Sequence, residues 1–130
     1  RFVADFIGNC NLIDAEVAVI DGARVQLSAK GLGTVSAQLE QPVQIGQAGV
    51  LALRPEKLRF AIDHTPDENY FSGKIRHQLY LGDVTRYMVE LDEGLTLQVL
   101  LPNTSGGRSF DIGDSVQLAW HDTAGRFLNA

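Results

Sequence analysis

Residues 85–102, TRYMVELDEGLTLQVLLP, decide the fold class of this 130-residue chain. Apolar side chains stand at every second position on both sides of Asp92-Glu93-Gly94, namely at Tyr87, Val89, Leu91, Leu95, Leu97, Val99 and Leu101. Successive side chains of a β-strand point to opposite faces, so a period of two predicts half-buried strands. Because Asp and Gly favour tight turns, the segment predicts a β-hairpin.

The same period continues on both sides of this hairpin. Short segments with alternating or continuous apolar residues, separated by turns, lie at residues 15–19, 23–27, 35–39, 50–53, 58–62, 71–75 and 116–120. The continuous run at residues 50–53, VLAL, is typical of a strand buried on both faces. Roughly eight to ten short strands with frequent turns predict an all-β barrel or sandwich.

Two segments depart from the strand pattern. Residues 1–8 place Phe2, Val3, Phe6 and Ile7 at helical spacing before Gly8, which predicts the end of a linker helix. Because the chain opens on Arg1 rather than Met, we expect an excised piece of a longer protein. The polar residues 64–69 are the best internal boundary, which allows the β region 9–130 to divide into lobes at 9–63 and 70–130.

Composition narrows the class of partner. The chain is 45% hydrophobic and 21% charged, with a net charge of −5, which is the balance of a globular domain. An acidic total argues against nucleic acid or an anionic membrane surface as the main partner. No apolar run is long enough to cross a bilayer. A single cysteine, Cys10, excludes an internal disulfide framework and fits a reducing compartment.

Catalytic and cofactor motifs are missing from the sequence. Residues 105–107, SGG, are not followed by the Gly-Lys-Ser/Thr that a phosphate loop requires. The histidines His64, His77 and His121 share no metal-ligand spacing. The acid pairs Asp67-Glu68 and Asp92-Glu93 fall in predicted turns, where we expect them to be solvated. We therefore predict no catalytic, cofactor-binding or metal-binding residues.

Three parts of the chain together resemble one family. They are the opening RFVADFIGNCNLIDAEV, the segment VLALRPEKLRF, and a second half with a Tyr-Leu-Gly turn and a last strand that ends in tryptophan. In this order they resemble the transport-associated OB (TOBE) domain at the C-terminus of ABC importer ATP-binding subunits, with the polyamine (spermidine/putrescine) group most similar. The signature positions, which are also candidates for interaction, are Arg54, Pro55, Glu56, Tyr80, Leu81, Gly82 and Trp120.

This resemblance implies an OB-like β architecture and a non-catalytic role. It implies a homodimer in which the domain tethers or regulates a pair of ATPase domains. The partners implied are the ATPase domain of the same chain and the membrane permease subunits, at the cytoplasmic face of the inner membrane. ATP and magnesium would belong to the missing ATPase domain, and this fragment would hold no cofactor.

Two alternatives remain open. The first is a sensor of small ligands, in which glycine-rich turns would bind an oxyanion or carboxylates near Tyr87 would bind a polyamine. Those carboxylates are Asp83, Glu90, Asp92 and Glu93. The second is an oligonucleotide-binding OB module, which would use a basic group. That group consists of Lys74, Arg76, His77 and Arg86.

Overall fold

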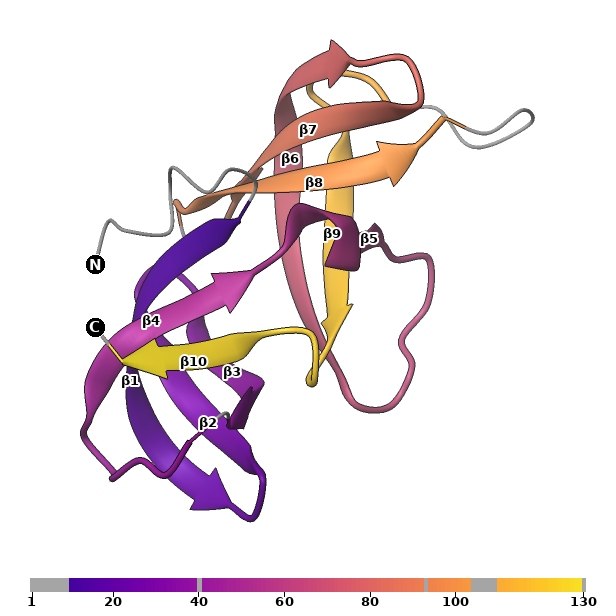
Figure 1. The fold of residues 1–130 in the computed structure, drawn as a ribbon. Helices are drawn as coiled ribbons and strands as arrows, with labels where there is room; N and C mark the ends of the chain where they lie inside the picture. Colours follow the sequence, from indigo (N-terminus) through magenta and orange to yellow (C-terminus); the bar gives the residue numbers. More distant parts are fainter. Residues whose placement is uncertain (1–9, 40, 93, 104–109, 130) are drawn as a thin grey trace.

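The computed structural model describes residues 10–39, 41–92, 94–103 and 110–129, and the predicted linker helix at residues 1–8 lies outside them. The described residues form ten strands and a 3-10 helix (Figure 1). These elements are β1 (Asn11–Asp21), β2 (Arg24–Ala29), β3 (Gly33–Leu39), β4 (Ala48–Leu53), η2 (Pro55–Lys57), β5 (Arg59–Phe60), β6 (Glu68–Tyr80), β7 (Val84–Leu91), β8 (Thr96–Pro102), β9 (Ser115–His121) and β10 (Arg126–Asn129). The predicted all-β class and its strand number are confirmed.

One group of strands closes into a barrel in the order β1-β2-β3-β10-β4. β1 pairs antiparallel with β2 and β4, and β2 pairs antiparallel with β3. β10 closes the barrel, since it runs antiparallel to β4 and parallel to β3 (Figure 1). Closure leaves the barrel strands paired on both sides, which removes exposed edges.

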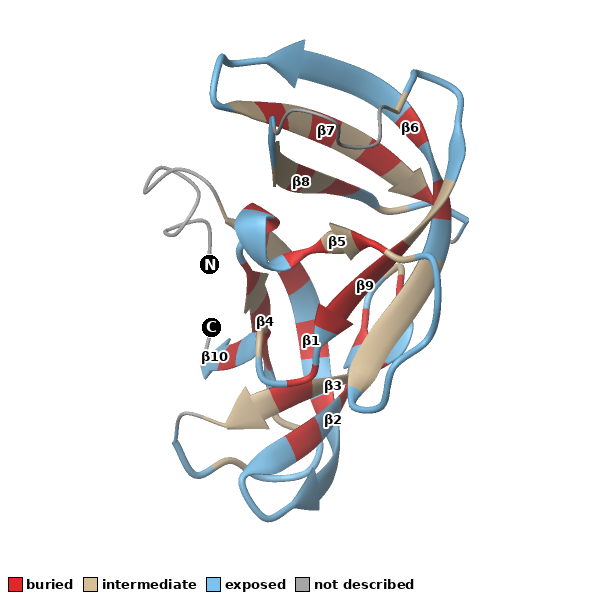
Figure 2. Cartoon of the chain, turned by 90° about the vertical axis from the view of Figure 1, so that its right-hand side faces the viewer, coloured by how far each residue is buried: buried red, intermediate tan, exposed pale blue. Residues whose placement is uncertain are grey.

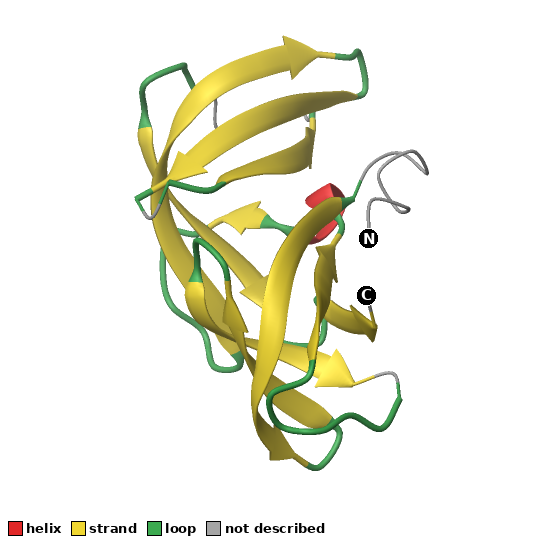
Figure 3. Ribbon diagram, turned by 90° about the vertical axis from the view of Figure 1, so that its left-hand side faces the viewer, coloured by secondary structure: helices red, strands yellow, loops and turns green. Residues whose placement is uncertain are grey.

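The other strands form an open antiparallel sheet in the order β5-β9-β6-β7-β8. Figure 3, in which strands are yellow and helices red, shows how far strands dominate the described chain. The pairing of β7 with β8 runs from Val84 opposite Pro102 to Glu90 opposite Thr96, which confirms the hairpin predicted from residues 85–102. Within the described residues, no helix is both long enough and apolar enough to span a bilayer.

The chain passes twice between the barrel and the open sheet. β5 pairs with β9 in the sheet although it precedes the polar segment 64–69. β10 follows β9 but returns to the barrel beside β4. The open sheet therefore contains one strand from before residues 64–69, and the barrel contains one strand from after them. The boundary between the two β units does not coincide with a single break at residues 64–69.

Alternation predicts most of the core but fails at Val19, Ala23 and Ile62, which are exposed. Ala15 and Val17 are buried, whereas Val19 is 46% exposed, because a bulge between Val17 and Val19 shifts the register and turns the following side chains outward. Ile62 was expected to be buried and is 76% exposed, because β5 ends at Phe60. The alternating burial along β7 is visible in Figure 2.

Two asparagines join the barrel to the open sheet. Asn11 of β1 donates from Nδ2 to the carbonyl of Gln98 in β8 (3.0 Å) and accepts the Gln98 N–H at Oδ1 (2.8 Å). Asn69 of β6 exchanges the same pair of bonds with the backbone of Ser36 in β3, at 3.2 and 3.0 Å. An amide side chain offers one acceptor and one donor group, so each asparagine pairs with the neighbouring strand as a peptide unit would.

Candidate functional site

The Arg54-Pro55-Glu56 signature lies where β4 ends. Pro55 is the first residue of η2 and is buried, while Arg54 precedes it in an extended conformation. Proline cannot donate to a strand ladder, which explains why β4 stops here. Arg54 is exposed and its Nη1 atom lies 3.7 Å from Glu56 Oε2. Pro55 is therefore structural, and Arg54 and Glu56 are the members of the signature that can meet a ligand or partner.

Arg54 opens onto a cavity of about 570 Å³, here named the basic cavity. Its lining residues are Cys10, Ala52, Arg54, Lys57, His121, Thr123, Ala124 and Arg126. Three of the eleven lysines and arginines of an acidic chain line this one cavity, together with a histidine. None of the described residues that line the basic cavity carries a carboxylate. The basic cavity is thus a local concentration of positive charge.

The turn between β9 and β10 shapes one side of the basic cavity. The N–H of Thr123 donates to His121 Nδ1 at 3.1 Å, and Asp122 Oδ1 lies 3.2 Å from the same nitrogen. The Thr123 hydroxyl lies 2.8 Å from the same nitrogen. Asp122 is buried next to it and pairs with Arg24 Nη1 of the barrel at 2.7 Å. The turn is therefore held in place by the barrel.

The Tyr80-Leu81-Gly82 signature forms the turn between β6 and β7. Gly82 has a φ of 94°, which glycine adopts without strain. Tyr80 is 72% exposed, Leu81 46% and the preceding Leu79 54%. We name Leu79, Tyr80 and Leu81 the apolar tip. Large apolar side chains exposed to this extent at consecutive positions are candidates for an interaction surface.

Trp120, the last signature residue, lies away from both surfaces. It is 1% exposed in β9 and stacks on Phe71, with ring centroids 5.2 Å apart. Its position indicates a core role. The signature residues therefore divide between the basic cavity, the apolar tip and the core, and do not form one site.

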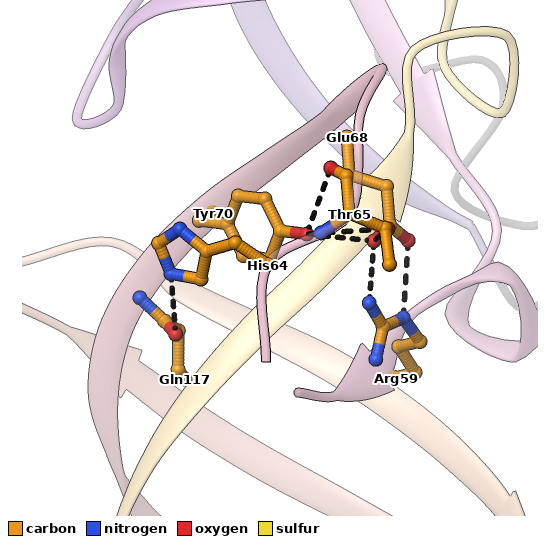
Figure 4. A network of polar contacts seen from close by, with 6 residues as sticks. All are labelled: Arg59, His64, Thr65, Glu68, Tyr70 and Gln117. Atoms are coloured by element: carbon orange, nitrogen blue, oxygen red, sulfur yellow. Dashed lines mark hydrogen bonds and ion pairs between the residues drawn. The ribbon is translucent and has the colours of Figure 1, made fainter. Parts of the chain in front are cut away.

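A polar network that the sequence did not predict holds the loop between β5 and β6 (Figure 4). Glu68 was expected to be a solvated turn residue, but it is the first residue of β6 and accepts a bond from Arg59 Nε at 3.0 Å. Arg59, Thr65 and Tyr70 all bond this carboxylate, with the Arg59 bond the largest cause, and lower its pKa to about 2. His64 stacks on the Tyr70 ring.

Local sequence offers little signal for this network. Arg59 and Glu68 are nine residues apart, and only the pairing of both β5 and β6 with β9 brings them together. The network fixes the loop geometry through hydrogen bonds among its own side chains. We assign it a structural role.

The carboxylates considered for polyamine binding are not gathered around Tyr87. Glu90 pairs with Arg76 at 2.7 Å. Tyr87 is buried and packs against Phe60 and Phe110. Asp83 lies in the turn that follows the apolar tip, and Glu93 is outside the described residues. Arg76, one cation of the basic group considered for nucleic acid, thus lies beside an acidic side chain.

A larger cavity of about 830 Å³ lies over β6 and β9. Lys74, Asp92 and Asp114 line it together with Phe60 and Phe110. Charges of both signs therefore lie on its walls. In the part of the chain that the structure describes, no three His, Cys, Asp or Glu side chains come together as a metal site.

The closed barrel with its attached antiparallel sheet defines an OB-like β domain. The family model described as the TOBE domain matches residues 51–128, and the chain belongs to the TOBE domain family. The matched region includes the Arg54-Pro55-Glu56 segment, the apolar tip and Trp120.

Curated relatives match over the whole chain. It is 51% identical over 134 aligned positions to the spermidine/putrescine import ATP-binding protein PotA of Pseudomonas aeruginosa strain UCBPP-PA14, covering 100% of this chain and 37% of that protein. The protein of the same name from Chromobacterium violaceum is 44% identical, over 98% of this chain and 37% of its own length. The chain therefore spans little more than a third of the length of these relatives.

A solved structure shares the fold. The cytoplasmic molybdate-binding protein ModG, in a crystal form with molybdate bound, superimposes with a TM-score of 0.79 over 92% of this chain and 96% of that chain. The sequences are 13% identical, so the comparison shows the fold alone.

Proposed function

We propose that this chain is the non-catalytic regulatory and dimerisation domain of the ATP-binding subunit of a bacterial polyamine importer. The observation that carries the proposal is the 51% identity over the whole chain to a spermidine/putrescine import ATP-binding protein. The relatives extend well beyond the matched region, and their ATP-binding names refer to the complete proteins. ATP and magnesium would bind in the ATPase domain of the complete subunit.

The mechanism follows from tethering. Two copies of the domain that stay associated keep their ATPase domains at a high effective concentration for one another. The ATPase domains then open and close without separating. A ligand or partner that prefers one arrangement of the pair shifts the equilibrium by its difference in affinity for the two states.

The proposed partners are a second copy of this chain, the ATPase domain of the same subunit, and the permease subunits at the cytoplasmic face of the inner membrane. The apolar tip and Arg54 are the signature positions with side chains available for such contacts. Trp120 and Pro55 are buried and would support the fold instead.

Uptake of labelled spermidine tests this proposal in a strain that lacks the gene and carries the complete subunit on a plasmid. We expect the wild-type subunit to restore uptake, and Tyr80→Ser with Leu81→Ser to lower it at least about fivefold at equal protein level. Ile45→Ser is the matched control, since Ile45 is 70% exposed and lies on a barrel loop. A wild-type subunit that fails to restore spermidine uptake would contradict the assignment.

A second candidate is a small-ligand sensor, and the basic cavity favours this function. Three cationic side chains line this one cavity, and they favour an anion over a polyamine because like charges repel. The fold is also that of a molybdate-binding protein. Regulation of the ATPase pair by an anion is compatible with tethering.

A further inference from the structure

The cations of the basic cavity come from separate parts of the chain. Arg54 immediately precedes η2 and Lys57 is its last residue, while Arg126 begins β10, about seventy positions later in the sequence. The return of β10 to the barrel brings them together, because Arg126 pairs with Ala52, two residues before Arg54. The three cations therefore come together because β10 pairs with β4, and Arg126 would leave the cavity if β10 did not pair there.

The remaining wall is made of small side chains. Ala52, Ala124 and Thr123 are small side chains among the described residues that line the cavity. At about 570 Å³ the space falls in the range of small-molecule pockets, roughly 300–1,000 Å³. It is several times larger than a bare tetrahedral oxyanion needs, and it can hold an anionic group attached to an organic body.

Glu56 is an acidic side chain that would compete weakly with an anionic ligand for Arg54. The 3.7 Å contact between Arg54 Nη1 and Glu56 Oε2 joins two exposed side chains, and such pairs contribute little in water. A phosphate dianion carries more charge than one carboxylate and accepts two parallel bonds from a guanidinium. It would therefore displace Glu56 from Arg54, and Glu56 would oppose its binding.

We propose that the basic cavity binds the phosphate group of a small organic phosphate, held by Arg54, Lys57 and Arg126, with the body of the ligand against Ala52, Ala124 and Thr123. His121 lies on the same wall. This inference deepens the sensor candidate and does not depend on dimerisation or on polyamine transport.

Isothermal titration calorimetry on the intact chain at low salt tests the proposal with AMP, inorganic phosphate and adenosine. We expect AMP to bind, adenosine not to bind, and the affinity for AMP to fall as NaCl is raised. Arg54→Gln, Lys57→Gln and Arg126→Gln should each weaken AMP binding roughly threefold to tenfold. Glu56→Gln should tighten it, which tests the cavity with a variant that removes no cation.

Lys30→Gln is the matched control, because Lys30 is an exposed cation outside the basic cavity. Equal affinity for AMP and inorganic phosphate would contradict the contact of the ligand body with Ala52, Ala124 and Thr123, because the phosphate alone would then supply the binding energy. The proposal is overturned if AMP gives no heat at millimolar concentration, or if Lys30→Gln weakens binding as much as the cavity variants do. Neither result would bear on spermidine uptake by the complete subunit.

Discussion

Asn11 and Asn69 carry the contact between the barrel and the open sheet, and the cost of removing them can be measured. Truncating either side chain leaves a backbone N–H and a carbonyl of the facing strand without their partner. We expect Asn11→Ala and Asn69→Ala each to lower the free energy of unfolding by about 1–3 kcal/mol in urea denaturation. Ser28→Ala, on the exposed face of β2, should change it by less than about 0.5 kcal/mol. If Asn11→Ala and Asn69→Ala lower the free energy of unfolding no more than Ser28→Ala does, the two asparagines do not stabilise the fold.

Glu68 predicts a specific dependence of stability on pH. Its pKa falls from the ordinary value of 4.5 to about 2 in the folded protein, chiefly through the bond from Arg59. A carboxylate whose folded pKa is lowered stabilises the fold above its unfolded pKa, and this stabilisation disappears as the pH falls from about 4.5 to 2.

Glu68→Gln should therefore lower the free energy of unfolding by about 1–2 kcal/mol at pH 7, with the difference from wild type shrinking toward zero near pH 2. Urea denaturation at several pH values measures the difference. Glu16→Gln, at an exposed position of β1, serves as the control. A gap that stays constant between pH 7 and pH 2 would contradict the role assigned to the Glu68 carboxylate.

Individual residues differ in how far sequence could predict their roles. Pro55, Gly82 and Trp120 were expected as signature positions, yet the sequence does not say which are buried and which are exposed. Glu68 and Asn69 were assigned to a polar boundary, because a polar residue at the start of a strand looks the same as one in a loop. Their actual partners, Arg59 and Ser36, become neighbours only through tertiary pairing.

Among the strands, β10 is the element on which both the barrel and the basic cavity depend. It passes so close to β4 that a Cβ at Gly49 would lie 2.3 Å from the Leu128 carbonyl oxygen and 2.5 Å from the Phe127 ring. Phe127 is fully buried in the core. Only glycine allows this approach without moving β10.

Gly49→Ala should consequently destabilise the protein by about 1–3 kcal/mol or more and loosen β10 before the rest of the fold. Thermal unfolding and amide hydrogen exchange at Phe127 and Leu128 provide the measurements. Ala48→Ser, at the neighbouring exposed position of β4, is the control. Unchanged amide exchange at β10 in the Gly49→Ala variant would show that the close approach of Gly49 to β10 is not needed to hold this strand in place.

Strands with local partners are the ones that the sequence predicts well. The hairpin of β7 and β8 pairs across a short turn, so alternation and turn chemistry are sufficient to predict it. β10 pairs with β4, about seventy-five positions away, and β5 has only two residues, so local periodicity could not place them. The bulge in β1 is a further change that alternation alone does not reveal.

The whole molecule combines a closed barrel, an open sheet and two distinct surfaces. The apolar tip lies at the β6–β7 turn, and the basic cavity lies where β4, η2 and the β9–β10 turn meet. Separate surfaces allow one domain to contact a protein partner and a small anion independently.

Double substitution at Tyr80 and Leu81 should therefore leave the affinity of the intact chain for AMP unchanged within about twofold. Substitutions in the basic cavity should leave the free energy of unfolding within about 0.5 kcal/mol of wild type.

Sedimentation velocity of the complete subunit without nucleotide tests the tethering proposal most directly. The measurement compares the wild-type subunit with a version that ends before residue 10, across a range of concentrations that includes the micromolar. We predict that the complete subunit remains a dimer without nucleotide, and that the shortened version is a monomer which still binds ATP. A complete subunit that is monomeric throughout this range, or a shortened version that dimerises equally well, would contradict the tethering role.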